Sequence, residues 1–100
     1  MIRHVVMWKV KATDGYSAQE NAARLRDALL ALEGQVPELL EIEAGVNELE
    51  GGEAMDVVLI ASFADYSALE RYQRHPAHLE VATLVGEIRS ERRAVDFSVS

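Results

Sequence analysis

The sequence predicts an α+β fold with the ferredoxin-like element order strand, helix, strand, strand, helices, strand. Stretches in which apolar and other residues alternate, typical of strands, are separated by stretches with apolar residues three or four apart, typical of helices. Glycine and proline fall between several of these stretches. A length of 100 residues suits one domain, 1–100. This order predicts a four-stranded antiparallel sheet with its helices on one face.

The first strand and the first helix have clear local signals. Residues 2–10 are rich in β-branched and aromatic side chains and contain no glycine or proline. Ser17 and Glu20 fit a capping box, which begins a helix that runs to about Glu33. Gly34 then suits a left-handed C-terminal cap. The apolar stripe of this helix consists of Ala22, Leu25, Leu29 and Leu32.

Two further strands are expected at 39–48 and 55–63. The short loop between them contains glycine, which is typical of an antiparallel hairpin. In the first of the two, Glu41 and Glu43 alternate with apolar residues. One face of that strand is therefore expected to be partly exposed to water.

A short second helix is predicted to start at Asp65 or at Ser67, where a second capping box is present. It ends early because Pro76 disfavours helical geometry at His75. Pro76 itself suits the first position of a third helix, since proline has no N–H group to leave unpaired there.

The third helix is expected to reach Val85 or Gly86. The last strand is expected at 92–99, where Val95, Phe97 and Val99 alternate with other residues.

The predicted helices cover only one face of the sheet, yet two strands are apolar on both faces. The residues expected on the uncovered face are Val5, Met7, Val58 and Ile60. Left in water, they would form an apolar patch that is large for a monomer. A homodimer with the two sheets packed face to face is therefore expected. The alternative is that these side chains are singly exposed, which is common for valine.

Charge and composition exclude several classes of partner. The net charge of −7 disfavours a nucleic-acid partner. The one tight basic group, Arg89, Arg92 and Arg93, is interpreted as solvated charge near a strand. No apolar run is long enough to span a membrane, and the first residues do not resemble a signal peptide. Cysteine is absent, so a cytoplasmic protein without disulfides is expected.

The segment from Tyr72 to His78 is the strongest candidate for chemistry. The bend at Pro76 can aim both rings into one space, where a tyrosine hydroxyl and an imidazole share acid–base work. The structural alternatives are that His75 caps a helix, that His78 bonds a local carbonyl and that Tyr72 only packs. His4 is either a hydrogen-bonded core histidine or part of a pocket wall. No cofactor is expected, and two histidines three apart without a third ligand are a weak metal signal.

The segments 3–9, 56–63, 72–78 and 94–97 together resemble the stress-responsive A/B barrel family over nearly the whole chain. This resemblance implies a dimeric α/β barrel built from two ferredoxin-like halves. Members of the family include plant stress-induced proteins, so a stress-related role is also implied.

One branch of this family is a plant polyketide cyclase that closes a linear tetraketide by an aldol condensation without a cofactor. The resemblance assigns its acid–base pair to Tyr72 and His78, and a pocket histidine to His4. The sequence departs from the cyclase at Val57, where the cyclase has another histidine, and in a first helix without aromatic residues.

The resulting hypothesis is a homodimer with a small apolar pocket for an organic ligand in each subunit. The residues expected to line it are His4, Val6, Trp8, Val57, Leu59, Tyr72 and His78. The alternative is a cofactor-free cyclase or lyase, in which His78 removes an α-proton and Tyr72 polarises the carbonyl oxygen. A further alternative is a cofactor-free monooxygenase of the related dimeric-barrel fold.

Overall fold

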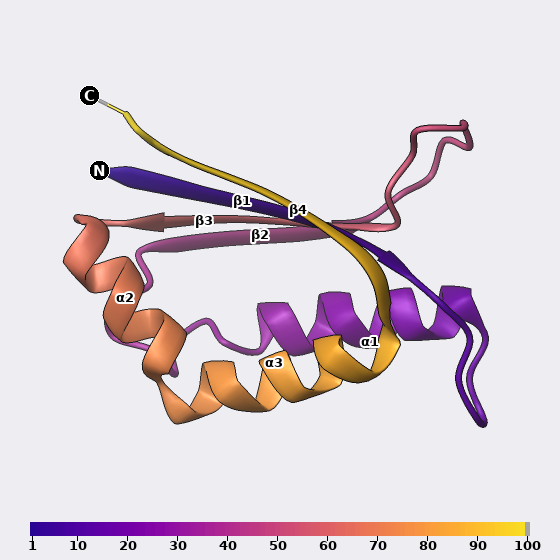
Figure 1. Cartoon of the computed structure of the whole chain (residues 1–100). Helices are drawn as coiled ribbons and strands as arrows, with labels where there is room; N and C mark the ends of the chain where they lie inside the picture. The colour runs from indigo at the N-terminus through magenta and orange to yellow at the C-terminus, as the bar shows by residue number, and fades with distance from the viewer. Residues whose placement is uncertain (100) are drawn as a thin grey trace.

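A computed structural model describes residues 1–99, and its elements follow the predicted order (Figure 1). They are β1 (Ile2–Val10), α1 (Ala18–Leu30), β2 (Glu41–Val46), β3 (Val57–Phe63), α2 (Tyr66–Arg74), α3 (Pro76–Ile88) and β4 (Arg89–Ser98).

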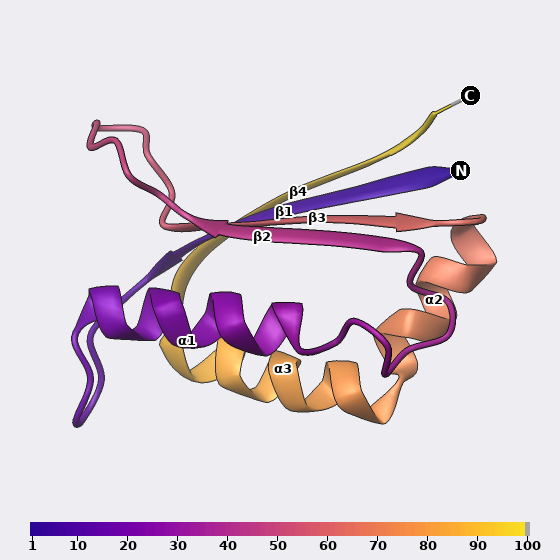
Figure 2. The ribbon, with the colours of Figure 1, turned by 180° about the vertical axis from the view of Figure 1, so that it is seen from behind.

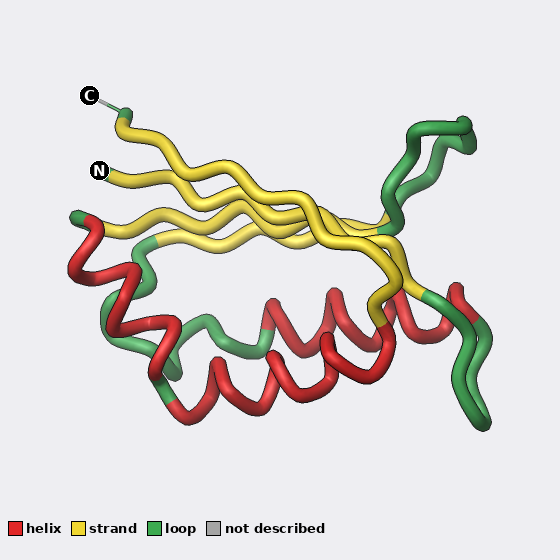
Figure 3. Tube along the Cα trace, viewed as in Figure 1, coloured by secondary structure: helices red, strands yellow, loops and turns green. Residues whose placement is uncertain are grey.

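The four strands form one antiparallel sheet in the order β2-β3-β1-β4. All three helices lie on the same side of this sheet, as the two opposite views show (Figures 1 and 2). Within residues 1–99 the other side carries no helix, and the loop 47–56 rises on that side at one end of the sheet (Figure 3). The ferredoxin-like fold predicted from the element order is thus confirmed.

The strand faces follow the predicted alternation. On β1 the even-numbered side chains are buried, while the odd-numbered ones are half-buried or exposed. Val5 stands opposite Ile60, and Met7 opposite Val58, so these four side chains share the face that the helices leave open. On β2 the exposed Glu41 and Glu43 lie on this same face.

The start of α2 corrects the predicted capping box at Ser67. The N-cap of α2 is Asp65, whose carboxylate accepts from the backbone N–H of Ala68 at 2.8 Å. Ser67 lies inside the helix, and its hydroxyl accepts from Arg71 at 3.0 Å. A Ser67 capping box is therefore wrong, because the aspartate two residues earlier satisfies the free N–H group.

The bend between α2 and α3 is as predicted. His75 is extended, with φ −65° and ψ 138°, and Pro76 is the first residue of α3. The Nδ1 atom of His75 accepts from the backbone N–H of Ala77 at 3.0 Å, so His75 caps α3.

Several boundaries differ from those predicted. β2 is shorter than 39–48, and α1 ends at Leu30, so Gly34 lies in the following turn, with φ +83°. α3 continues to Ile88 and β4 begins at Arg89, because β4 stays paired with β1 through charged residues that show no apolar alternation.

Candidate functional site

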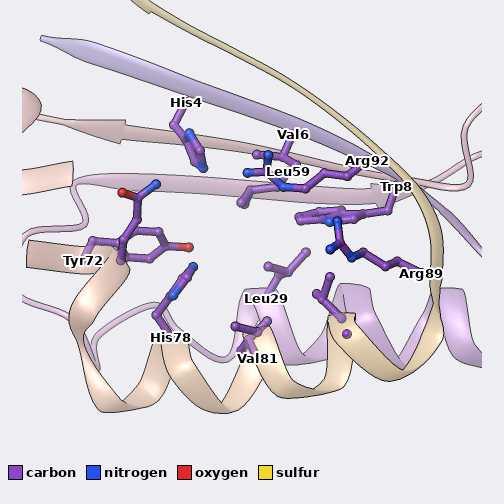
Figure 4. A pocket seen from close by; sticks show the side chains of 14 residues that line it. His4, Val6, Trp8, Leu29, Leu59, Tyr72, His78, Val81, Arg89 and Arg92 are labelled. Carbon is purple, nitrogen blue, oxygen red and sulfur yellow. The ribbon is translucent and has the colours of Figure 1, made fainter. Parts of the chain in front are cut away.

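A cavity of about 310 Å³ lies between the sheet and the helices, and β4 contributes Arg89 and Arg92 to its wall (Figure 4). This volume is at the lower end of the range for small-molecule sites. Its lining comes from six of the seven elements and consists of His4, Val6, Trp8, Leu29, Leu59, Tyr72, Gln73, His78, Val81, Ala82, Val85, Gly86, Arg89 and Arg92.

Tyr72 and His78 meet at one wall of this cavity. Their ring centroids are 4.6 Å apart, with an interplanar angle of 61°. Phe63 packs on Tyr72 at 4.8 Å, so the phenol ring is held between two other rings. The Tyr72 hydroxyl points into the cavity, and His78 rises toward it from the first turn of α3 (Figure 4). The extended residue before Pro76 produces this meeting by redirecting the chain between the two rings.

Three buried polar atoms of the described residues have no hydrogen-bond partner, and all three belong to residues that line this cavity. They are Trp8 Nε1, the Tyr72 hydroxyl and His78 Nδ1. Buried polar atoms are nearly always hydrogen-bonded in native proteins. Their concentration here indicates a site that binds polar groups of a ligand or of water.

Burial shifts the pKa values of Tyr72 and His78 in opposite directions. Burial raises the pKa of Tyr72 to about 12, so the phenol remains a hydrogen-bond donor at neutral pH. Burial also lowers the pKa of His78 below its ordinary value. The charges of His4 and Arg92 contribute to this decrease, and the backbone of Gln73 opposes it. His78 is therefore a neutral imidazole near pH 7, which is the form that accepts a proton.

His4 belongs both to the core and to the cavity wall. It is buried, and its Nδ1 atom is hydrogen-bonded to the Asp96 carboxylate. This bond fixes the orientation of the ring, as carboxylates do for functional histidines. Sequence reasoning missed Asp96, although antiparallel pairing of β1 with β4 places it directly opposite His4.

Six of the seven residues predicted to line the pocket do so, and Val57 does not. Val57 is buried in the hydrophobic core, opposite Trp8. The sheet order explains the difference. Near Trp8 the cavity is lined by β1 and β4, and β3 lies on the other side of β1 from β4.

The basic group is exposed on β4, as its interpretation as solvated charge near a strand predicts, and two of its three arginines also line the cavity. Arg89 and Arg92 line the cavity, whereas Arg93 faces the opposite side of the sheet, where it stands across from Met7. The alternation of the last strand is the signal that distinguishes Arg92 from Arg93.

Within residues 1–99, no group of three or more His, Cys, Asp or Glu side chains is arranged to hold a metal ion. No helix in that range is long and apolar enough to cross a bilayer.

Solved structures with the same fold cover nearly all of the chain. A dimeric protein of unknown function from Bacteroides fragilis is 24% identical, with a TM-score of 0.82, covering 98% of this chain and 95% of its own. The hydroxynitrile lyase of Passiflora edulis is 14% identical, with a TM-score of 0.80 over 99% and 93%. SnoaB, a cofactor-independent oxygenase from Streptomyces nogalater, is 16% identical, with a TM-score of 0.71 over 99% and 92%. At these identities the likeness shows the fold alone.

Sequence comparison gives the family. An uncharacterized protein of Streptomyces coelicolor is 35% identical over 78 residues, which are 78% of this chain and 79% of that protein. The sequence model of the stress responsive A/B barrel domain family matches residues 2–99. This chain, with its ferredoxin-like sheet and its Tyr72–His78 wall, therefore belongs to the stress responsive A/B barrel domain family.

Proposed function

We propose that this protein is a homodimer that binds a small carbonyl compound in the cavity of each subunit and transfers protons on it without a cofactor, as a lyase or cyclase does. The observation that carries this proposal is the contact between Tyr72 and His78, whose hydroxyl and Nδ1 are both buried and unpaired at one cavity wall.

In the proposed reaction the neutral imidazole of His78 removes a proton from the carbon next to the carbonyl. The electron pair of the broken C–H bond moves into an enolate, and the Tyr72 hydroxyl stabilises the enolate oxygen by donating a hydrogen bond. The enolate then adds to a second carbonyl of the same molecule, which forms a C–C bond and an alkoxide. In the reverse cleavage His78 instead removes the proton of a hydroxyl group, the C–C bond breaks, and a carbonyl fragment and an enolate are formed. His78 returns its proton to the oxygen or carbon that becomes negative. No electrons are gained or lost overall.

His4 supports this site from the sheet side. The Asp96 carboxylate occupies its Nδ1 atom, so the remaining nitrogen of this cavity-lining ring is left for a ligand. We assign this nitrogen to orienting the ligand, and the acid–base work to Tyr72 and His78, whose rings meet at the cavity wall.

Two enzymes of other activities share this fold at low sequence identity. One is a hydroxynitrile lyase that covers 99% of this chain, so the fold is compatible with the lyase form of this proposal. The oxygenase shares the fold, but no residue of this cavity specifically favours oxidation.

The homodimer is supported by the uncovered sheet face and by the dimeric Bacteroides fragilis neighbour. That face carries apolar side chains on β1, β3 and β4, of which Val95 and Phe97 are the most exposed. A second copy packed against it would remove this surface from water.

The test measures hydrogen–deuterium exchange at the α-carbons of 4-phenyl-2-butanone in D₂O by NMR, which needs no knowledge of the natural substrate. We expect the wild-type protein to accelerate the exchange and His78→Gln to abolish the acceleration. His75→Asn is the matched control, because asparagine keeps the helix cap and His75 does not line the cavity. Exchange at the rate of buffer alone, with the ketone bound, would leave a binding protein and overturn the catalytic part of the proposal.

A further inference from the structure

Two arginines stand at the cavity, away from the acid–base pair. Arg89 follows the last residue of α3, and Arg92 extends from β4 on the side that faces the helices, opposite Trp8. Figure 4 shows both side chains directed into the pocket region near Trp8 and Val6, while Tyr72 and His78 occupy its other end.

Neither guanidinium has a charged partner among residues 1–99. No carboxylate of this range lies within 4.0 Å of Arg89 or Arg92, although the sequence has 17 acidic and 10 basic residues. By contrast, Arg93 is 3.9 Å from Glu91. The carboxylate on the cavity side of β4, Asp96, is bonded to His4.

The surface between the two ends is apolar. The side chains of Val6, Leu29, Leu59 and Val81 line the cavity there, and all four are buried. A ligand that fills this space has an apolar body, a carbonyl beside Tyr72 and a group at the opposite end that suits two unpaired guanidinium ions. Arginine forms short, frequently bidentate hydrogen bonds with carboxylates.

We propose that the ligand is a small organic acid whose carboxylate is held by Arg89 and Arg92 and whose carbonyl reaches Tyr72 and His78. This inference rests on the proposed function and adds the chemical class of its substrate.

The positive charge of Arg92 affects the pKa of His78 in the acid–base pair. After burial, it is among the causes that lower the pKa of His78. A carboxylate bound to Arg92 offsets this charge, so ligand binding makes His78 a stronger base.

The test compares 4-phenylbutanoate with 4-phenylbutanamide, which differ in the charge of one end. Trp8 is the single tryptophan and lines the cavity, so quenching of its fluorescence reports binding directly. We expect the wild-type protein to bind the acid about tenfold more tightly than the amide, since charge-assisted hydrogen bonds are roughly twice as strong as neutral ones. Added salt should weaken binding of the acid only.

The variants Arg89→Gln and Arg92→Gln should each weaken acid binding about tenfold and leave amide binding unchanged. Unchanged amide binding shows at the same time that each variant is folded. Arg93→Gln is the matched control, an arginine of the same strand on the opposite face, and should bind both probes like the wild type.

The outcomes separate the two proposals. If the amide binds as tightly as the acid, or if Arg93→Gln weakens acid binding as much as Arg92→Gln, the arginine site is wrong and the proposed pocket stands. If neither probe binds the wild-type protein, the pocket itself is wrong and this inference fails with it.

Discussion

Tyr72 is the side chain on which the proposed function depends. It is fully buried between Phe63 and His78, so its ring orientation is set by packing, yet its hydroxyl has no partner within residues 1–99. An unpaired buried hydroxyl costs folding free energy. A fold that retains such a group at a cavity wall has it available for a ligand.

Replacing Tyr72 with phenylalanine should therefore separate stability from activity. The variant keeps the ring packing and loses only the unpaired hydroxyl, so its midpoint of thermal unfolding should be equal to or above that of the wild type. Its rate of α-proton exchange should fall by roughly 100-fold, since one hydrogen-bond donor to the developing oxyanion is lost. Thermal unfolding and NMR exchange measure the two effects. An unchanged exchange rate would remove Tyr72 from the mechanism.

His78 should make both activity and stability depend on pH. Its pKa in the folded state is below the ordinary value, so the neutral base persists to lower pH, and activity should decline only below about pH 6.5. The unfolded state binds the proton more readily, so this histidine's contribution to stability is present above pH 6.5 and is lost on acidification.

Denaturant unfolding of the wild type and of His78→Gln, at about pH 7.5 and about pH 5, measures the stability effect. The wild type should lose more stability than the variant between these two values. An equal loss would show that His78 titrates alike in the folded and unfolded states.

At the level of elements, local signals define the site's framework. The capping box of α1 is formed as predicted, with Ser17 accepting from the N–H of Glu20 at 3.0 Å. The cap of α2 and the bend at Pro76 fix the direction in which Tyr72 and then His78 leave the chain. A change in these caps therefore alters stability and the geometry of the site together.

The N-cap of α2 provides a matched pair of variants. Asp65→Ala should lower the free energy of unfolding by about 1 kcal/mol, because the N–H of Ala68 loses its acceptor. Ser67→Ala should change it by less than about 0.5 kcal/mol, since Ser67 is exposed and inside the helix. Denaturant unfolding measures both. The opposite ranking would restore Ser67 as the cap.

Much of this framework could be predicted from the sequence, because periodicity and turn signals are local. The alternation of β1 identified its buried face, and Pro76 located the bend. The Asp96 bond to His4 required the register between β1 and β4, which joins residues 92 positions apart. The cavity position of Arg89 could not be predicted either, since a charged residue at the junction of α3 and β4 shows no periodicity that reveals its direction.

At the level of the whole molecule, the two faces of the sheet have different surroundings. The face toward the helices encloses the core and the cavity. The opposite face presents apolar side chains from three strands, with the acidic side chains of β2 at one edge. Burial of this face in a dimer would leave the cavity on the other side of the sheet open to its ligand.

The dimer is best tested at an exposed position of that face, because a substitution there does not disturb the core of one subunit. Val95 is 55% exposed and stands opposite Val5, whereas Leu79 is 52% exposed on α3. Val95→Asp should convert the dimer to monomers in light scattering at micromolar concentration, since a buried, unpaired carboxylate costs several kcal/mol. Leu79→Asp should leave the dimer intact, because the same charge there remains in water. If both variants stay dimeric, the two copies do not meet through this face, and its apolar side chains require a different partner.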